Sequence, residues 1–350
     1  MALATSGLTT HILNNNLKSA ILLACFPLLI LLIVYGFQVG LYYFGFYSPH
    51  FVSPAATGQD TAYIFNHALN QTVYVTPYIF GGILIWFTIA WLFHGRMIRA
   101  VSGAVPVTRE EFPKIYNMLE NLCISRGIPM PKFQIIDSPA LNAFASGINE
   151  KTYAITLTRG IVYALEDDEL NAVIAHELTH IMNRDVRLMM VAIIFVGIIS
   201  FLAELAFRSM IYGRYTAASR YVRSQQRGNG GIFIVLLGFV ILAIGYVFAI
   251  LIRFGISRRR EYLADAGAVE LTKDPAAMMR ALMRISKRAE IKDMPRDIKQ
   301  MCIENPSNFM GMFASHPPIE KRISVLSELT ATPVPELPVS LKRPPKRPWD

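Results

Sequence analysis

Four long apolar stretches constrain this chain more than any other feature of its sequence. They cover residues 19–46, 75–93, 189–207 and 232–252. Each has about the 20 residues that a helix needs to cross a bilayer core of roughly 30 Å. Since lipid offers no partner for backbone polar groups, each stretch is expected to be helical. The sequence therefore predicts about four transmembrane helices.

The composition agrees with a membrane protein, because 53% of the residues are hydrophobic and only 17% are charged. Basic residues exceed acidic ones by 34 − 25 = 9. We assign this excess to loops that face the cytoplasm and anionic lipid, and we expect no nucleic-acid partner. Cys25, Cys123 and Cys302 are few and scattered, which indicates a reducing compartment and no disulfide framework.

The first two stretches belong to an N-terminal anchor, residues 1–100. The polar loop 47–73 between them has no Lys or Arg, whereas Arg96 and Arg99 follow the second stretch at once. Positive charge favours the cytoplasmic side. We therefore predict a multi-pass protein of the plasma (inner) membrane with both termini in the cytoplasm.

The other two stretches form a predicted hairpin, residues 189–252, inserted into the polar part of the chain. The loop between them carries five arginines. If both stretches cross the bilayer, this loop lies outside, against the positive-inside tendency. A hairpin that stays buried in one leaflet is the alternative. We favour crossing.

Residues 101–188 and 253–330 are predicted to form one cytoplasmic α+β domain, followed by a proline-rich basic tail, 331–350. Half-buried alternation and β-branched residues indicate strands, and capping residues and apolar periodicity indicate helices. The predicted strands are 132–137, 141–148 and 153–158. The predicted helices are 108–125, 167–187, 257–271, one that starts at Asp274 as N-cap, and 319–329.

The helix 167–187 carries the motif His-Glu-x-x-His. Residues four apart lie on one helix face, so His176 and His180 can bind one zinc ion. Glu177 lies beside them and can accept a proton from a water molecule without being a ligand. The alternative is an ordinary polar helix face, but the apolar stripe and the acidic first turn of this helix favour the metal site.

The third ligand must come from elsewhere in the chain. Glu261 follows the second hairpin, which returns the chain to the side where His176 and His180 lie. Two histidines and one carboxylate, with a fourth position left to water, are the ligand set of a catalytic zinc. Asp265, four residues later, would accept the spare ring N–H of a histidine ligand. The sequence thus predicts one Zn²⁺ per chain.

The motifs HELTH (176–180), SRRREYLAD (257–265) and ASHPPIEKR (314–322) resemble those of the HtpX family of membrane-bound zinc metalloproteases. The resemblance covers about residues 100–330. It implies a zincin-like metallopeptidase fold and an endopeptidase that removes misfolded or damaged membrane proteins under stress. It also implies that His316 and Arg322 lie in the active site, near the substrate or its oxyanion.

The substrate is expected to be a membrane protein or an unfolded polypeptide. Main-chain pairing along an edge strand tolerates many sequences, and the segment 142–147 is the candidate strand. Its predicted substrate-binding residues are Asn142, Ala143, Phe144 and Ala145. Three alternatives stay open: a CAAX-type protease, which has about seven spans, a sensor that signals through a protease domain, and a catalytically silent membrane scaffold.

Overall fold

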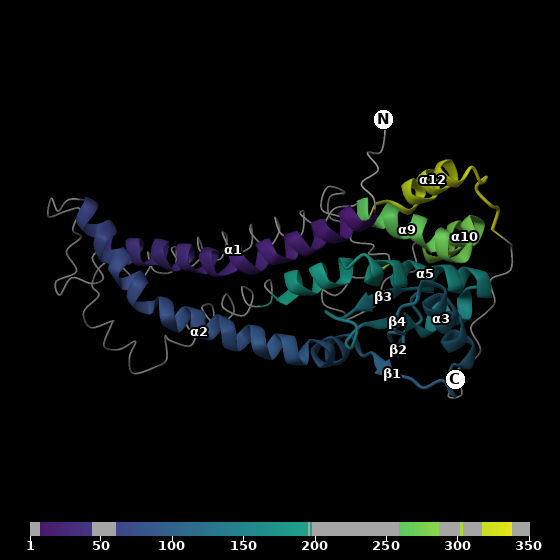
Figure 1. Cartoon of the computed structure of the whole chain (residues 1–350), viewed down its shortest axis with the longest axis horizontal. Coiled ribbons are helices and arrows are strands. Elements are labelled where there is room, and N and C mark those ends of the chain that lie inside the picture. The colour runs from purple at the N-terminus through teal and green to yellow at the C-terminus, as the bar shows by residue number, and fades with distance from the viewer. Residues whose placement is uncertain are drawn as a thin grey trace. The chain divides into compact units, whose positions relative to one another are not determined.

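A computed structural model of the chain describes residues 8–43, 61–194, 197, 259–286, 302–303 and 317–337. The chain divides into two compact units. The sheet-containing unit comprises Met1–Ser19, Leu92–Val191 and Phe254–Asp350. The apolar unit comprises Ala20–Trp91 and Ala192–Arg253. Figure 1 shows the helices and strands of both units, coloured along the chain from purple at the N-terminus to yellow at the C-terminus.

Two long helices provide most of the described part of the apolar unit. Helix α1 covers Leu8–Tyr43 and helix α2 covers Thr61–Ser102. Each is long and apolar enough to cross a membrane, α1 over Ser19–Gly40 and α2 over Thr61–Ser102. Their large apolar side chains are exposed, among them Leu28, Leu32, Tyr78, Leu84 and Leu92. The first two predicted spans are therefore present as helices with a surface suited to lipid.

The predicted loop 47–73 is wrong from residue 61 onward, because α2 already begins at Thr61. Ile64, Ala68 and Thr72 are buried at a spacing of four residues, which is the spacing of one helix face. The polar side chains of Asn66, Asn70 and Gln71 between them are exposed. An amphipathic first part of a helix was thus mistaken for a loop because its mean polarity is high.

The third and fourth apolar stretches lie almost wholly outside the described residues. Residues 189–194 and 197 are helical. The two predicted spans at 189–207 and 232–252, and the number of four spans, stay predictions.

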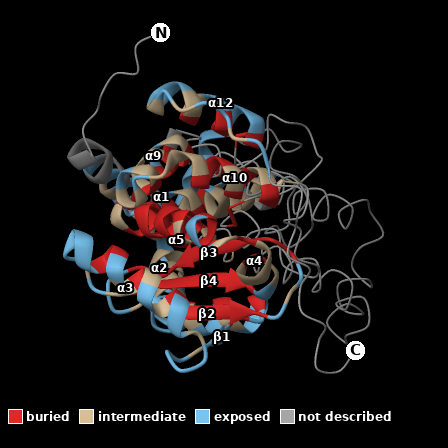
Figure 2. Ribbon diagram, turned by 90° about the vertical axis from the view of Figure 1, so that its right-hand side faces the viewer, coloured by how far each residue is buried: buried red, intermediate tan, exposed pale blue. Residues whose placement is uncertain are grey.

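Four short strands form the sheet, in the order β1-β2-β4-β3 (Figure 2). The strands are β1 Val105–Pro106, β2 Lys132–Ile136, β3 Ala143–Ser146 and β4 Ala154–Thr158. β2 and β4 run parallel, while β1 and β3 each pair antiparallel with their neighbour. The three predicted strands are present with slightly shorter bounds, and β3 is an edge strand of this sheet.

Strand β4 was predicted to be half-buried, but the structure buries all five of its residues. It lies between β2 and β3, so its polar side chains need partners inside the protein. The hydroxyl of Thr158 donates to the backbone oxygen of Asn142 at 2.9 Å. The hydroxyl of Thr156 donates to the side-chain oxygen of Gln134 at 3.3 Å. Because of these hydrogen bonds, a strand in which polar and apolar residues alternate can be buried on both faces.

Helix α3 covers Pro113–Arg126 and therefore starts five residues later than predicted. The Glu111 carboxylate does accept the backbone N–H of Thr108, at 2.6 Å, as the capping pattern suggested. However, the residue before a proline avoids the helical conformation, and Phe112 has φ −135° and ψ 60°. The proline thus sets the start of the helix, and residues 109–112 form a turn ahead of it.

Helix α4, Arg159–Ala164, was not predicted, and it leads directly into α5, Asp167–Met182. Glu169 accepts the Glu166 backbone N–H at 2.9 Å and so caps the start of α5. The predicted helix was to continue to Arg187, but α5 ends at Met182. Arg184 has a positive φ of 59° and donates its backbone N–H to Ile181. A left-handed residue ends a helix, and the chain restarts as a new helix at Asp185.

Three further helices lie in the described part of the sheet-containing unit, at the positions predicted from the sequence. They are α9 Arg259–Thr272, α10 Pro275–Ile285 and α12 Ile319–Thr330. Helices α9 and α10 pack on α5, and α12 packs on α9 and α10, so these helices form layers above the sheet (Figure 2). A Cβ on Gly267 would lie 2.4 Å from the side chain of Thr179. Glycine therefore permits the close approach of α9 to α5.

Candidate metal centre

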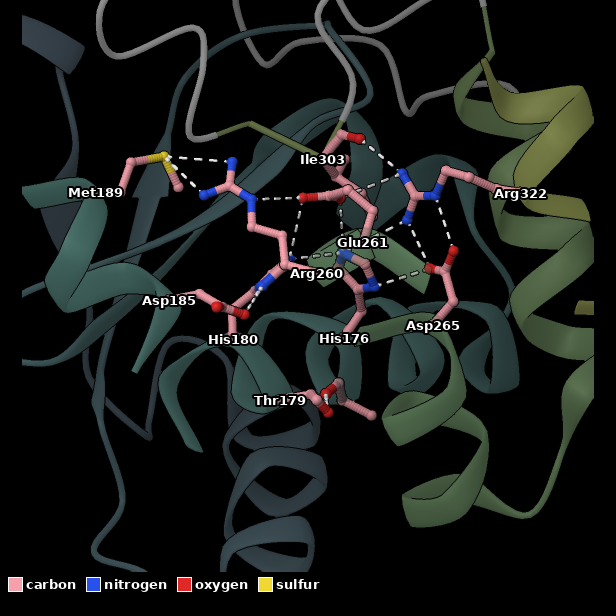
Figure 3. Close-up of polar contacts among 11 residues, drawn as sticks. His176, Thr179, His180, Asp185, Met189, Arg260, Glu261, Asp265, Ile303 and Arg322 are labelled. Carbon is pink, nitrogen blue, oxygen red and sulfur yellow. Dashed lines mark hydrogen bonds and ion pairs between the residues drawn. The ribbon is translucent and has the colours of Figure 1, made fainter. Parts of the chain in front are cut away.

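The two histidines of the motif face a carboxylate that α9 supplies from far along the chain (Figure 3). Nε2 of His176 and Nε2 of His180 are 3.2 Å apart. Each lies 3.8 Å from a different oxygen of Glu261. The three ligand atoms lie within 4.8 Å of one another, and all three residues are buried. The structure thus brings together the three metal ligands that were predicted from the sequence.

This donor set fits a divalent metal ion. Two imidazole nitrogens and one carboxylate oxygen are the ligands that zinc takes in catalytic sites. The centre is built from two helices in close contact, so its geometry does not depend on a surface loop. Three protein ligands leave one position of a tetrahedral ion open to a water molecule or a substrate.

Glu177 lies next to this cluster with 2% of its surface exposed. Burial raises the pKa of its carboxyl group to about 7, and the nearby Glu261 carboxylate adds to the rise. The backbone N–H of Ala145 and the neighbouring His180 act in the opposite direction. A carboxyl group that titrates near neutrality is well matched to accept and return a proton. Its position and pKa suit the role of general base that was predicted for it.

The two histidines differ in their charge preference. Burial lowers the pKa of His176 to about 4, so its ring is neutral near pH 7, which is the form that binds a metal. Burial also opposes the charged form of His180, but the carboxylates of Glu261 and Asp185 outweigh it and raise its pKa. A bound cation would take the place of the proton that these carboxylates favour.

Asp265 lies where it was predicted, beside a histidine ligand. Its Oδ1 is 3.0 Å from Nδ1 of His176, a position in which it can accept the ring N–H and orient the ring. Burial alone would raise its pKa, but the Arg322 guanidinium outweighs burial and holds the pKa at about 2. Asp265 is therefore ionised across the ordinary pH range.

Arg322 was expected near the substrate or its oxyanion, and the structure gives it other partners. It is fully buried, and it donates to both carboxylate oxygens of Asp265, at 2.9 and 2.6 Å. It also donates to the backbone oxygen of Ile303 at 3.1 Å. Through Asp265 it acts on the orientation of His176. Its Nη2 also lies 3.5 Å from Nε2 of His176, so Arg322 adjoins the metal centre directly. Its expected role near the substrate or its oxyanion stays a prediction.

Asp185 is a site residue that the sequence analysis missed. Its Oδ2 lies 3.0 Å from Nδ1 of His180, so His180 has a carboxylate partner as His176 does. A continuous helix would place a residue five positions on about 140° away from His180. The left-handed Arg184 breaks the helix and turns Asp185 back toward the ring. Only this break, which was not predicted, could have revealed the pair.

The predicted substrate strand lies beside the site as edge strand β3. The backbone N–H of Ala145 bonds to the Glu177 carboxylate, as noted above, and thus ties β3 to α5. The backbone oxygen of Ala143 accepts the N–H of Ile303 at 2.9 Å. Part of the outer edge of β3 is therefore already paired with the chain itself.

The other two predicted substrate-binding residues of this strand, Asn142 and Phe144, are buried inside the protein. Phe144 is 1% exposed, and Asn142 is buried. The side-chain oxygen of Asn142 accepts the backbone N–H of Ala143 at 2.9 Å. A substrate role of these two residues stays a prediction. His316 lies outside the described residues, and its expected catalytic role also stays a prediction.

Comparisons with known proteins agree with this geometry. The model of peptidase family M48 matches residues 109–330. A protease HtpX homolog of Bacteroides fragilis (strain YCH46) is 46% identical over 334 residues, which cover 92% of this chain and 98% of that protein. A protease HtpX homolog of Listeria monocytogenes serotype 4a is 39% identical over 243 residues, 67% of this chain and 79% of that protein.

Among solved structures, the crystal structure of S. mikatae Ste24p is similar with a TM-score of 0.45 and 22% identity. The match covers 71% of this chain and 57% of that chain. The family match spans the helices that hold His176, His180 and Glu261, and the likeness to the Bacteroides relative extends over 92% of the chain. By the match of its catalytic part and by its identity over nearly its whole length, this chain belongs to peptidase family M48, as a membrane-associated metalloprotease of the HtpX family.

Proposed function

We propose that this protein is a zinc-dependent endopeptidase that cleaves misfolded or damaged membrane proteins as part of quality control under stress. His176, His180 and Glu261 hold one Zn²⁺ per chain, and Glu177 is the general base. The protein is a multi-pass protein of the plasma membrane, with the catalytic domain and both termini in the cytoplasm. The observation that carries the proposal is the convergence of three buried ligand atoms within 4.8 Å, next to a carboxylate of raised pKa.

Zinc, when bound, supplies Lewis acidity, since it lowers the pKa of a coordinated water to about 7 and polarises a carbonyl group. The chain supplies the remaining chemistry. Glu177 accepts a proton from the attacking water and returns it to the amine that leaves. Asp265 and Asp185 keep the rings of His176 and His180 in the orientation that binding requires.

The substrate lies extended beside β3. In a strand, backbone groups alternate in direction, so the carbonyls of Ala143 and Ala145 point to the same outer side. Ile303 already occupies the carbonyl of Ala143. The substrate backbone therefore pairs with β3 beyond this point, close to Glu177. Main-chain pairing of this kind suits a protease that accepts many sequences.

The test uses the full chain purified in detergent. We expect about one zinc per chain by metal analysis and cleavage of casein that a chelator abolishes and added zinc restores. Glu261→Gln should lose the zinc, because it removes one of the three protein ligands. A protein that binds zinc but cleaves neither casein nor itself would support a silent scaffold and contradict the proposal.

A further inference from the structure

Arg260 is a second buried arginine at the metal centre. It is 4% exposed, and its Nε lies 3.3 Å from Oε1 of Glu261. This is the carboxylate oxygen that faces His180. On the other side of the same carboxylate, Nη1 of Arg322 lies 3.8 Å from Oε2. Figure 3 shows Glu261 between the two guanidinium groups.

The two arginines differ in how their terminal nitrogens are used. Those of Arg322 bond to Asp265 and to the backbone oxygen of Ile303, and its Nη2 also lies 3.5 Å from Nε2 of His176. Within the described residues, the terminal nitrogens of Arg260 contact only the thioether sulfur of Met189, each at 3.8 Å. A thioether is a weak acceptor. Arg260 thus keeps most of its capacity to donate hydrogen bonds.

Such an arrangement is costly to fold. A buried guanidinium has lost its hydration, and only well-formed hydrogen bonds with an anion offset that loss. Nε of Arg260 makes no hydrogen bond of good geometry in the described part of the chain. A buried polar group without strong partners calls for a functional explanation, and a ligand that arrives later is the simplest one.

We propose that Arg260 is a further catalytic residue, whose guanidinium binds the oxygen of the scissile peptide carbonyl and stabilises the negative charge that this oxygen gains. The inference rests on the proposed peptidase function. A planar guanidinium presents two parallel N–H groups to an oxygen anion. In a buried site its charge is worth far more than in water. Arg322 is hydrogen-bonded to Asp265, so Arg260 has more donors available for this oxyanion.

The step is balanced without transfer of a proton from Arg260. A water oxygen bonds to the carbonyl carbon, the C=O electron pair moves to the carbonyl oxygen, and Glu177 takes one water proton. Arg260 donates hydrogen bonds to the resulting oxyanion. The carbonyl then re-forms, the C–N bond breaks, and the proton held by Glu177 passes to the leaving nitrogen.

The experiment compares Arg260→Gln with the wild type in the zinc-loaded full chain. A phosphonate peptide mimics the charged tetrahedral centre, and a hydroxamate peptide of the same sequence is the matched ligand without a tetrahedral oxyanion. We expect the phosphonate Kd and kcat each to worsen roughly 100- to 1,000-fold, the usual effect of losing one oxyanion donor. The affinities for the hydroxamate and for zinc should each fall less than about 10-fold. A loss of about 10-fold or more is what removal of a residue that orients a metal ligand costs.

Arg126→Gln is the control, because Arg126 pairs with Glu270 on the surface, away from the metal centre. If Arg260→Gln does not fold, Arg260→Lys carries the test. It keeps the charge but loses the fork, so the phosphonate should still weaken more than the hydroxamate. Equal weakening of both ligands, or a loss of zinc affinity that alone explains the lower activity, would overturn the inference. So would an unchanged phosphonate affinity.

The outcomes also separate this inference from the proposed function. If the wild type binds zinc and phosphonate but cleaves no peptide, the proposed function fails. In that case a selective loss of phosphonate binding in Arg260→Gln would still establish Arg260 as an oxyanion site. If the wild type cleaves casein and the variant binds both ligands as the wild type does, only the inference about Arg260 fails.

Discussion

Helices α1 and α2 expose large apolar side chains, whereas α5 and α9 bury charged side chains where the two helices meet. Leu84 on α2 is 66% exposed. In contrast, His176, Glu261 and Asp265 on α5 and α9 are at most 1% exposed. An exposed leucine surface is stable in lipid, and a buried charge is stable only with partners. The two regions are therefore built for different surroundings, and the charged interior of α5 and α9 can do chemistry because its partners are fixed.

The largest effect is expected from Glu177→Gln, which tests whether the buried charge serves chemistry. The amide cannot accept a proton, so cleavage should fall roughly 100- to 10,000-fold, the range for a general base. Zinc content should stay the same because Glu177 is no ligand. Casein cleavage and metal analysis on the same sample measure both. Cleavage at the wild-type rate would remove Glu177 from its role.

Arg322→Met tests whether the charges of α9 and α12 depend on each other. The variant leaves Asp265 buried without its cation, which typically costs about 3–5 kcal/mol. Thermal or denaturant unfolding in detergent measures the loss. The matched control is the double variant Arg322→Met with Asp265→Leu, in which both charges are absent and most of the stability should return. A double variant no more stable than Arg322→Met would argue against a paired contribution.

Leu84→Arg on α2 tests the exposed apolar surface. A charge at the middle of a membrane helix costs about 2.5–3.5 kcal/mol of apparent insertion free energy. Ile124 on α3 is 71% exposed in the sheet-containing unit and offers the control. Ile124→Arg should change stability by no more than about 0.5 kcal/mol. A membrane-insertion assay for α2 and unfolding of the full chain give the two values, and equal tolerance of both changes would break the comparison.

Gly267→Ala tests the close contact that brings Glu261 to the histidines. The added methyl group would lie 2.4 Å from the side chain of Thr179, and overpacking of this kind costs about 1–3 kcal/mol. Zinc affinity should fall as well, because the two helices move apart. Thr179→Ala removes the opposing atoms, so the double variant should regain stability. No regain would mean that the strain lies elsewhere.

The smallest effects are expected for the labelling of two cysteines, Cys123 in the sheet-containing unit and Cys25 on α1. The protein interior covers Cys123, and lipid is expected to cover Cys25. Burial raises the pKa of Cys123 to about 11, and only the thiolate reacts. The pKa of this thiol is about 8.5 in the unfolded chain. The stability that its neutral form contributes is fully present below about pH 8.5, and it is lost as the pH rises toward 11. At pH 8 a charged maleimide should label Cys123 only after unfolding.

Cys25 is exposed on α1 and lies within a candidate span. In sealed membranes a charged maleimide should not label it, because a thiol that faces lipid does not form the reactive thiolate. The same reagent should label it after the protein is solubilised and unfolded. Mass spectrometry of the labelled protein distinguishes the two cysteines. Rapid labelling of Cys25 by the charged reagent would mean that this face of α1 meets water and not lipid.

Much of the fold could be predicted because local signals are strong in this sequence. Apolar length predicted α1 and α2, alternation predicted β4, and Asp274 before a proline predicted the start of α10. The errors have local causes as well. Pro113 delayed α3, and the amphipathic start of α2 was too polar to be recognised as part of an apolar helix.

The sequence by itself determined the ligand types and their spacing, since residues four apart must share a helix face whatever surrounds them. It also indicated Glu261 and Asp265, because the chain returns after the second hairpin. Only the tertiary structure decided which charged groups meet. Asp185 contacts His180 because the helix breaks before it. Arg322 is hydrogen-bonded to Asp265, whereas the terminal nitrogens of Arg260 contact only the sulfur of Met189 among the described residues. These contacts depend on how helices pack in three dimensions, and no local pattern in the sequence encodes a distance across such a contact.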